Sequence, residues 1–232
     1  LDELRRIEVK DNQLHIGAMA THLQLVKSDL VNENLSVLAA AAADVGSPQI
    51  RSRGTIGGNI CTSSPAGDLL APLLSYEASF KLQSADGERI VEAQKFFTGP
   101  KRNLMEADEL LTEIIIPLTE NEREGAWVKV GRRKALVIST LTLSVVLEFE
   151  SDKIVKAGVA MGSVAPTPVR IGEVEEMMLG GKLSELDYKK LGQEVKARIN
   201  PIDDLRGTKE YREDVAVDVM IRALNEIEGK RG

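Results

Sequence analysis

The alternation of apolar and polar residues divides the chain into short strands and amphipathic helices. Apolar residues at every second position predict a half-buried strand, whereas spacings of three and four predict a helix with one apolar face. The clearest helical pattern is formed by Val217, Met220, Ile221, Leu224 and Ile227. The predicted strands cover 7–9, 14–17, 78–83, 90–91, 109–116, 127–130, 139–149 and 154–163. The predicted helices cover 22–29, 35–43, 69–76, 170–180, 184–198 and 209–228.

Turn and capping residues join these elements into an α+β arrangement of two parts. The tight turn at 150–152 predicts an antiparallel hairpin between the two longest strands. Asn34 and Asp68 each precede a predicted helix and are expected to cap it. The charged segment 119–125 is the best candidate for a connector. We therefore expect one domain over residues 1–120 and a second, a small antiparallel sheet packed with helices, over 125–229.

Composition excludes several classes of protein. The formal net charge is −6 and aromatic residues make up only 3% of the 232 residues, which argues against a nucleic-acid binder. One cysteine, Cys61, and two histidines, His15 and His22, argue against a disulfide, an iron–sulfur cluster held by this chain alone and a structural metal site. No apolar run reaches the ~20 residues of a membrane span, and no signal peptide is visible, so we expect a cytoplasmic protein.

The glycine-rich segment 54–59 is the best candidate for chemistry. Gly57 and Gly58 allow positive φ and a close approach to backbone N–H groups, which favours phosphate or another electron-rich group. Thr55 and Asn59 add short polar side chains. The segment is neither a P-loop nor a dinucleotide fingerprint. Its spacing alone leaves two readings open, a cofactor-binding loop and a simple glycine turn followed by a helix.

Three motifs around this loop resemble a known family. They are Ser-Pro-Gln-Ile-Arg at 47–51, Gly-Thr-Ile-Gly-Gly-Asn at 54–59 and Ser-Pro-Ala-Gly-Asp at 64–68. In this order they are very similar to the signature of the FAD-binding (medium) subunits of molybdenum hydroxylases of the xanthine dehydrogenase, carbon monoxide dehydrogenase and aldehyde oxidoreductase type. The similarity extends over essentially the whole chain, through segments 14–18, 96–99, 109–117, 129–133, 162–168 and 206–212.

The resemblance implies a fold, a cofactor and a set of contacts. The fold would be the second lobe of a PCMH-type FAD-binding domain, with a mixed or antiparallel sheet and helices, followed by a carbon monoxide dehydrogenase flavoprotein-type C-terminal domain. Leu111 would pack on the isoalloxazine ring of FAD, Lys129 would lie near its polar edge, and Val45 stands where some relatives place an aromatic ring. No catalytic residue and no metal ligand is expected. The implied FAD contacts are Val45, Gly54, Thr55, Ile56, Gly57, Gly58, Asn59, Cys61, Ser64, Asp68, Leu111 and Lys129.

The resemblance also implies partners. A large subunit with the molybdenum cofactor would oxidise the substrate, and a small 2Fe-2S subunit would pass the electrons to FAD on this chain, which hands them to an external acceptor. An alternative is a scaffold subunit of the same complex without FAD. A second alternative, a stand-alone flavin reductase of related fold, is disfavoured by the motifs at 162–168 and 206–212.

Family members usually begin with a small lobe that carries a second glycine-rich loop, and this chain begins at Leu1 without that lobe. Half of the expected FAD contacts would then be missing, at ~1.5–3 kcal/mol for each lost charge-assisted hydrogen bond. We therefore expect the chain alone to bind FAD weakly or not at all. A longer natural chain, or a separate chain within a hetero-oligomer, would supply the lobe.

Other residues have ordinary structural explanations. Cys61 is expected to be a packed thiol, His22 a surface or capping residue, and Trp127 part of the core or of a domain interface. The acidic residues of segment 119–125 are expected to lie in a solvated loop. The 209–228 helix is expected to pack inside the chain.

Overall fold

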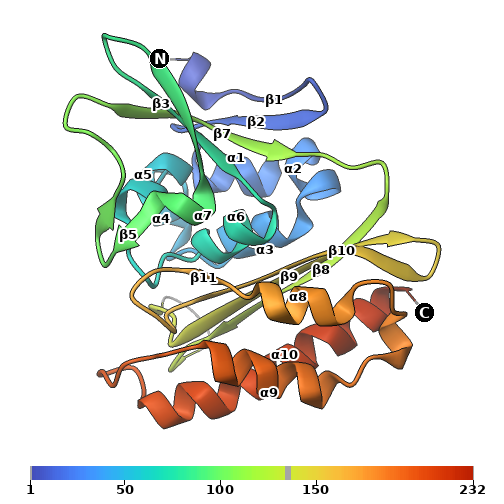
Figure 1. The fold of residues 1–232 in the computed structure, drawn as a ribbon. Helices are drawn as coiled ribbons and strands as arrows, with labels where there is room; N and C mark the ends of the chain where they lie inside the picture. The colour runs from blue at the N-terminus through green and yellow to red at the C-terminus, as the bar shows by residue number, and fades with distance from the viewer. Residues whose placement is uncertain (1, 134–136, 232) are drawn as a thin grey trace.

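The fold consists of four layers, sheet, helices, sheet and helices, from top to bottom of Figure 1. The computed structural model describes residues 2–133 and 137–231. The first sheet and the helices beneath it come from the N-terminal half, and the second sheet and the last helices come from the C-terminal half. This mixed architecture confirms the α+β fold class expected from the sequence.

The first sheet has five antiparallel strands in the order β1-β2-β7-β3-β4. The β1–β2 hairpin turns at Asp11 and Asn12, which take φ values of 50° and 57°, so the predicted turn is confirmed. The strands are β1 (Ile7–Lys10), β2 (Gln13–Gly17), β3 (Ser79–Gln83), β4 (Glu88–Glu92) and β7 (Leu110–Pro117), with a short 3-10 helix η1 (Glu3–Arg5) before them.

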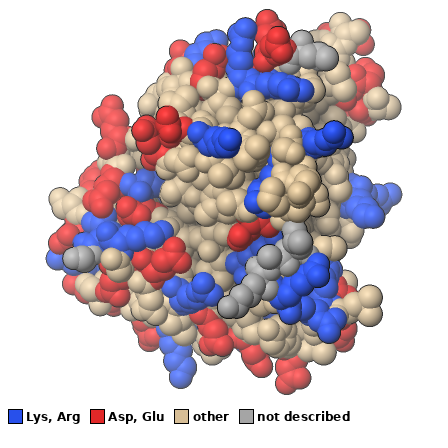
Figure 2. All heavy atoms as spheres, turned by 180° about the vertical axis from the view of Figure 1, so that it is seen from behind, with Lys and Arg blue, Asp and Glu red and all other residues tan. Residues whose placement is uncertain are grey.

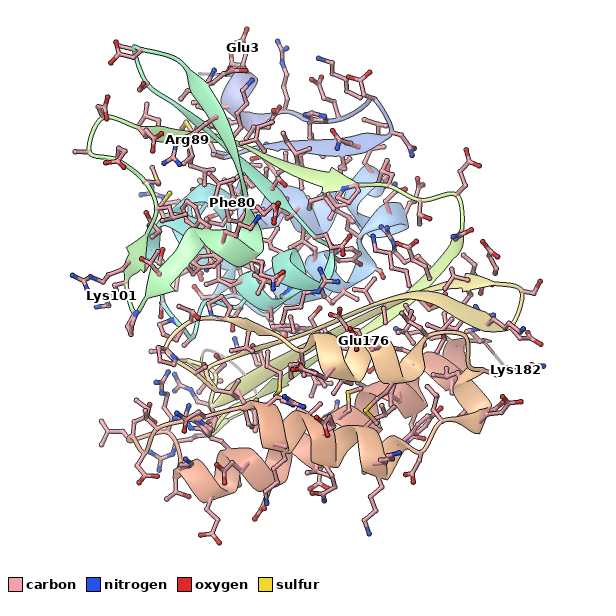
Figure 3. All side chains as sticks on the ribbon, viewed as in Figure 1. Glu3, Phe80, Arg89, Lys101, Glu176 and Lys182 are labelled. Atoms are coloured by element: carbon pink, nitrogen blue, oxygen red, sulfur yellow. The ribbon has the colours of Figure 1, made fainter. Side chains whose placement is uncertain are left out.

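Short helices pack below this sheet and form the first core with it. Phe80 lies within this core, where its ring meets the edges of Phe96 and Phe97 at centroid distances of 4.9 and 6.2 Å (Figure 3). The helices are α1 (His22–Lys27), α2 (Asp29–Asn34), α3 (Ser36–Ala43), α4 (Pro48–Arg51), α5 (Ile56–Thr62), α6 (Leu70–Ser75) and α7 (Ala93–Phe96). A small ribbon of β5 (Phe97–Gly99) and β6 (Arg102–Asn103) follows α7.

The second sheet has four antiparallel strands in the order β11-β10-β9-β8. The predicted hairpin between its two longest strands is confirmed and turns at Ser151, where φ is 56°. The strands are β8 (Glu122–Val130), β9 (Leu141–Glu150), β10 (Lys153–Gly162) and β11 (Val169–Arg170). The helices below are α8 (Gly172–Met178), η2 (Leu183–Glu185), α9 (Tyr188–Arg198) and α10 (Lys209–Arg231).

Strand β9 is buried on both faces because helices cover both sides of the second sheet. Leu143, Val145 and Leu147 point toward the C-terminal helices and join the second core. Ser144 and Val146 point the other way, toward the N-terminal helices, where Ser144 Oγ lies 2.5 Å from Ser75 Oγ of α6. The small residues of this second face let α6 pack closely on the sheet, so the first core extends from the N-terminal helices onto the second sheet.

Three local predictions were wrong. Asn34 ends α2 instead of capping α3, because its side-chain amide donates to the carbonyl of Leu30 at 2.9 Å. Asp68 does not cap α6, whose N-terminal flanking residue is Leu69. Segment 119–125 is only partly a connector, since β8 begins at Glu122. Its cross-strand bond from Arg123 to Glu148, at 2.7 Å, explains why these charged residues lie in a strand.

The longest helix, α10, packs against β8, β9 and α9, which confirms the prediction that it belongs to the interior of the chain. Within residues 2–133 and 137–231, no helix combines the length and the apolar character needed to cross a membrane.

Candidate functional site

A groove of about 920 Å³ opens where the two halves of the chain meet. Segment 43–51, from the end of α3 through α4, forms one side, and the end of β8 with the residues that follow it forms the other. Figure 2 shows Lys and Arg side chains gathered on this face. The basic residues that line the groove are Arg51, Lys129, Arg132, Arg133 and Arg222. The groove is therefore basic, although the chain as a whole carries a net charge of −6.

An ion pair between Asp68 and Lys129 lies at this junction. The Lys129 ammonium donates to Asp68 Oδ2 at 2.7 Å and to the carbonyl of Asp44 at 3.0 Å. The side chain of Lys129 is only 9% exposed and that of Asp68 only 12%. Burial raises the pKa of the Asp68 carboxyl, while the hydrogen bond from Lys129 acts in the opposite direction. The pair joins the loop before α6 to β8 of the second sheet, and sequence reasoning placed both residues near the cofactor without predicting their contact.

Asp44 links the same region to Trp127. Its carboxylate accepts a hydrogen bond of 2.9 Å from the indole Nε1 of Trp127. Trp127 stands on β8 but packs against the first core, which confirms its expected place at an interface. Sequence reasoning missed Asp44, since a lone acid after an alanine-rich helix carries no recognisable signal.

The glycine-rich segment forms the first turn of α5, and Gly57 and Gly58 are not among the residues with positive φ. The amide of Gly57 donates to the carbonyl of Ala18 at 2.9 Å, and the amide of Gly58 donates to Thr55 Oγ1 at 3.1 Å. A Cβ on Gly57 would lie 2.7 Å from the Ala18 oxygen, so glycine is needed there for the close approach of the loop after β2. The expectation of a turn that presents free amides to a ligand was wrong. Thr55 instead caps the helix, and Gly58 lies on its exposed side.

The other residues expected to contact the cofactor differ in their burial and in their backbone hydrogen bonds. Ile56 is fully buried and Leu111 is 8% exposed, so both side chains belong to the first core. Val45 is half-buried, and its carbonyl accepts a hydrogen bond from Arg51 at 3.1 Å. Gly54 donates to the carbonyl of Ile50 at 2.7 Å and accepts from the His22 amide.

Cys61 lies in the last turn of α5, where its carbonyl accepts a hydrogen bond from Asn103 of β6, and Ser64 lies in the loop that follows this helix. The Cys61 thiol is half-buried, 3.6 Å from the sulfur of Met105, and burial raises its pKa. This packed position is the one expected from the sequence. The Ser64 hydroxyl accepts a hydrogen bond from the amide of Ala66 at 3.3 Å and so shapes the loop that leads to Asp68.

His22 is buried at the start of α1, only 3% exposed, so the expected surface position was wrong. Burial, with a smaller contribution from the positive charge of Arg51, lowers the pKa of His22 to about 4. The imidazole is therefore neutral at physiological pH. A Cβ on Gly54 would lie 3.1 Å from this ring, so the residues before the glycine-rich turn pack directly on the histidine.

Several buried polar atoms have no hydrogen-bond partner within the described parts of the chain. Among them are the carboxylate oxygen Oδ1 of Asp68 and the amide oxygen Oδ1 of Asn59. Both are acceptors, and a buried acceptor without a donor is costly, so each suits a ligand that donates hydrogen bonds. In residues 2–133 and 137–231, no cluster of three or more His, Cys, Asp or Glu side chains could hold a metal ion.

Two family models match the chain one after the other. The model for the FAD binding domain in molybdopterin dehydrogenase matches residues 1–119, and the model for the CO dehydrogenase flavoprotein C-terminal domain matches residues 126–227. The chain therefore belongs to the family of FAD-binding medium subunits of the xanthine dehydrogenase and carbon monoxide dehydrogenase type. It is an oxidoreductase component with an FAD-binding domain, as the sequence motifs indicated.

Individual relatives agree with this assignment. The chain is 31% identical to the glyceraldehyde dehydrogenase medium chain of Sulfolobus acidocaldarius, over 98% of this chain and 80% of that protein. It is 36% identical to the nicotinate dehydrogenase FAD-subunit of Eubacterium barkeri, over 79% of this chain and 64% of that subunit. The chain thus spans somewhat less than two thirds of the latter protein.

Solved structures show the same fold. Carbon monoxide dehydrogenase from Hydrogenophaga pseudoflava matches with a TM-score of 0.93 and 32% identity, over 99% of this chain and 79% of the matched chain. Quinoline 2-oxidoreductase from Pseudomonas putida 86 matches with a TM-score of 0.89 at 22% identity, which supports the fold alone.

The side chains of the candidate site fit FAD. The pyrimidine edge of a flavin and the ribityl chain carry N–H and O–H donors, which the partnerless oxygens of Asp68 and Asn59 require. The groove is large enough for part of a dinucleotide, and its basic lining suits phosphate groups.

Proposed function

We propose that this chain is the flavin subunit of a molybdenum hydroxylase, taking electrons from the iron–sulfur clusters of a partner subunit and passing them to an external acceptor. FAD, when bound, supplies the redox chemistry, and the protein supplies binding, orientation and electrostatics. The observation that carries the proposal is the buried Asp68–Lys129 pair, which leaves one carboxylate oxygen without a donor beside a basic groove.

In this proposal, Asp68 accepts a hydrogen bond from the polar edge of the flavin through its free Oδ1. Lys129 neutralises the Asp68 charge through Oδ2 and remains close enough to stabilise negative charge that develops on the same edge. Asn59 and Thr55 contact the ribityl and phosphate groups through their side chains, because the amides around them already have acceptors. We keep Val45, Gly54, Ile56, Gly57, Gly58, Cys61, Ser64 and Leu111 as proposed members of the wall that encloses the cofactor.

The proposed partners are a large molybdenum subunit and a small 2Fe-2S subunit. The relatives are named as medium chains or FAD subunits, which supports membership of a complex of several subunits. Exposed apolar side chains lie near the groove, with Ile138 65% exposed and Leu205 93% exposed. The carbonyl of Leu205 accepts a hydrogen bond from Arg132 of the groove wall at 3.0 Å. An apolar and basic surface of this kind suits a protein partner that delivers electrons to the groove.

The two-domain division also remains a proposal, with an FAD-binding part over 1–120 and a C-terminal part over 125–229. The ranges matched by the two family models support it. So does the separation of the interior into one core around the first sheet and another around the last helices.

The deciding experiment isolates the assembled complex from its source cells through a tag on this chain. We expect FAD, iron and molybdenum in the purified material, together with two further polypeptides. Anaerobic addition of a chemical reductant should bleach the flavin absorbance, and its recovery on adding candidate acceptors identifies the acceptor.

The outcomes separate the proposal from its alternatives. Iron and molybdenum without flavin would favour the FAD-free scaffold. Flavin without iron, molybdenum or further polypeptides would favour a stand-alone flavoprotein.

A further inference from the structure

The ends of two neighbouring strands converge on one buried guanidinium group. Arg212, in the first turn of α10, is 1% exposed. Its Nη1 donates to the carbonyl oxygens of Thr140 and Ser163, at 2.9 and 2.6 Å. Thr140 immediately precedes β9, and Ser163 immediately follows β10. One side chain therefore fixes the two strand ends that lie nearest the groove.

Two more charged residues complete this cluster, named here the Arg212 cluster and consisting of Asp204, Arg206 and Arg212. Asp204 accepts hydrogen bonds from Arg212 Nη2 at 2.5 Å and from Arg206 Nε at 2.9 Å. These bonds, with Arg206 contributing most, hold the pKa of Asp204 well below its usual range. Arg206 also donates to the carbonyl of Ser139 at 3.4 Å. The cluster thus holds three backbone anchoring points, the carbonyls of Ser139, Thr140 and Ser163.

These anchoring points touch the loop that carries Asp68. The amide of Ser163 donates to the carbonyl of Pro65 at 2.7 Å, and the hydroxyl of Ser139 donates to the carbonyl of Ala66 at 3.5 Å. Gly162 permits the approach, since a Cβ there would lie 3.3 Å from the Pro65 oxygen and 2.6 Å from Thr142 Oγ1. Asp68 follows Ala66 by two residues, so its position depends on the strand ends that Arg212 holds.

The same strand ends set the position of Lys129. The amide of Thr140 donates to the carbonyl of Val130 at 2.7 Å, and Lys129 pairs with Thr142 across β8 and β9. Ala66, two residues before Asp68, is therefore in contact with Ser139. Val130, directly after Lys129, is in contact with Thr140. The Arg212 cluster reaches the pair from both sides.

We propose that Arg212, held by Asp204 and Arg206, is a positioning residue for the flavin site: it fixes the ends of β9 and β10 so that Asp68 and Lys129 meet in the geometry that binds the flavin edge. This inference rests on the proposed function. It also assigns a role to the segments 162–168 and 206–212, which no cofactor contact explained. A buried ion pair adds little net stability compared with apolar packing. A planar guanidinium with three fixed acceptors, however, defines backbone geometry closely.

The test compares flavin release from the tagged complex and its variants, followed by the rise in fluorescence of freed FAD. Arg212→Lys keeps the positive charge but loses the planar guanidinium fork. We expect FAD release to become about tenfold faster, an effect of the size measured when two contacting residues are energetically coupled. Asp68→Asn should accelerate release to a similar extent. The double variant should release FAD no faster than Asp68→Asn alone, because Arg212 acts through Asp68. Arg198→Lys, an exposed arginine with carboxylate partners on the last helices, is the matched control and should leave the rate unchanged.

A general loss of stability would give a different pattern. If Arg212→Lys and Asp68→Asn multiply their effects in the double variant, Arg212 does not act through the pair and the inference is overturned. If Arg212→Lys fails to assemble, Ser139→Ala removes only the hydroxyl contacts to Ala66 and Ser163. It should give a smaller acceleration, about threefold, again with no further effect beside Asp68→Asn.

A separate outcome concerns the proposed function. If Asp68→Asn leaves FAD release unchanged, the flavin site is wrongly placed. The positioning of Lys129 is then still measured without flavin by the emission of Trp127, because Asp44 bonds both Trp127 and Lys129. Arg212→Lys should shift that emission, and an unchanged spectrum overturns the inference by itself.

Discussion

Lys129 lines the groove and bonds to residues of two other elements. It neutralises the buried Asp68 and holds the Asp44 carbonyl, so it connects the loop before α6, the end of α3 and strand β8. A mostly buried charge without its partner costs far more than a pair at the surface. The energetic role of this pair can be measured without any cofactor.

We expect Lys129→Met to lower the free energy of unfolding by about 3 kcal/mol, because Asp68 is left as a lone buried charge. The double variant with Asp68→Asn should recover part of this loss. Urea denaturation at neutral pH, followed by Trp127 fluorescence, measures both. Lys81→Met breaks the more exposed Lys81–Glu88 pair and should cost less than about 1 kcal/mol. Equal losses for the two lysines would contradict this account.

Because His22 is buried, we expect the free energy of unfolding to depend on pH. Its pKa is about 4 in the folded chain against 6.5 when unfolded, so the unfolded state takes up a proton first as pH falls. The stability is fully present above pH 6.5 and is lost as pH falls through this window toward 4. At about 1.4 kcal/mol per pH unit, the loss reaches about 3 kcal/mol.

Urea denaturation of the natural chain and of His22→Asn at several pH values between 4 and 7.5 checks this expectation. The natural chain should lose stability toward low pH more steeply than the variant, which has no imidazole to charge. Parallel pH profiles would show that His22 does not titrate in this window.

At the scale of the elements, β9 explains what the sequence could and could not predict. Apolar residues alternate with Ser and Thr over residues 140–145, which correctly indicated a strand but not that both of its faces are buried. The hairpin, the last helix and the family motifs follow from local signals. The Asp68–Lys129 pair and the Arg212 cluster join residues 61 and 72 positions apart, and no local pattern encodes such contacts. The glycine-rich turn was misread because Gly57 serves packing against Ala18, which also lies far away in sequence.

Ser144 tests the close packing of β9 on α6. Ser144→Leu should lower the free energy of unfolding by about 1–3 kcal/mol although it adds apolar surface, because the hydroxyls of Ser144 and Ser75 are already 2.5 Å apart. Ser144→Ala keeps the space and should cost about 1 kcal/mol or less. Thermal or urea denaturation of the two variants distinguishes packing from polarity. A stabilised leucine variant would mean that α6 and β9 are not closely packed.

At the scale of the whole molecule, the two halves share a layer. The N-terminal helices pack upward on the first sheet and downward on the second, so neither half buries its surfaces without the other. We therefore expect the chain to unfold in one cooperative transition. Trp127 fluorescence, which reports the junction, and far-ultraviolet circular dichroism, which reports all helices, should give the same urea midpoint. Two separated midpoints would show that the halves unfold independently.

The basic groove has a consequence for how other molecules arrive. A chain with a net charge of −6 repels anions on average. The groove attracts them, however, because Arg51, Arg132 and Arg222 line it. Diffusing anions are therefore guided to that opening and turned away elsewhere, so the speed of capture should fall as added salt shortens the reach of the field to about 10 Å or less.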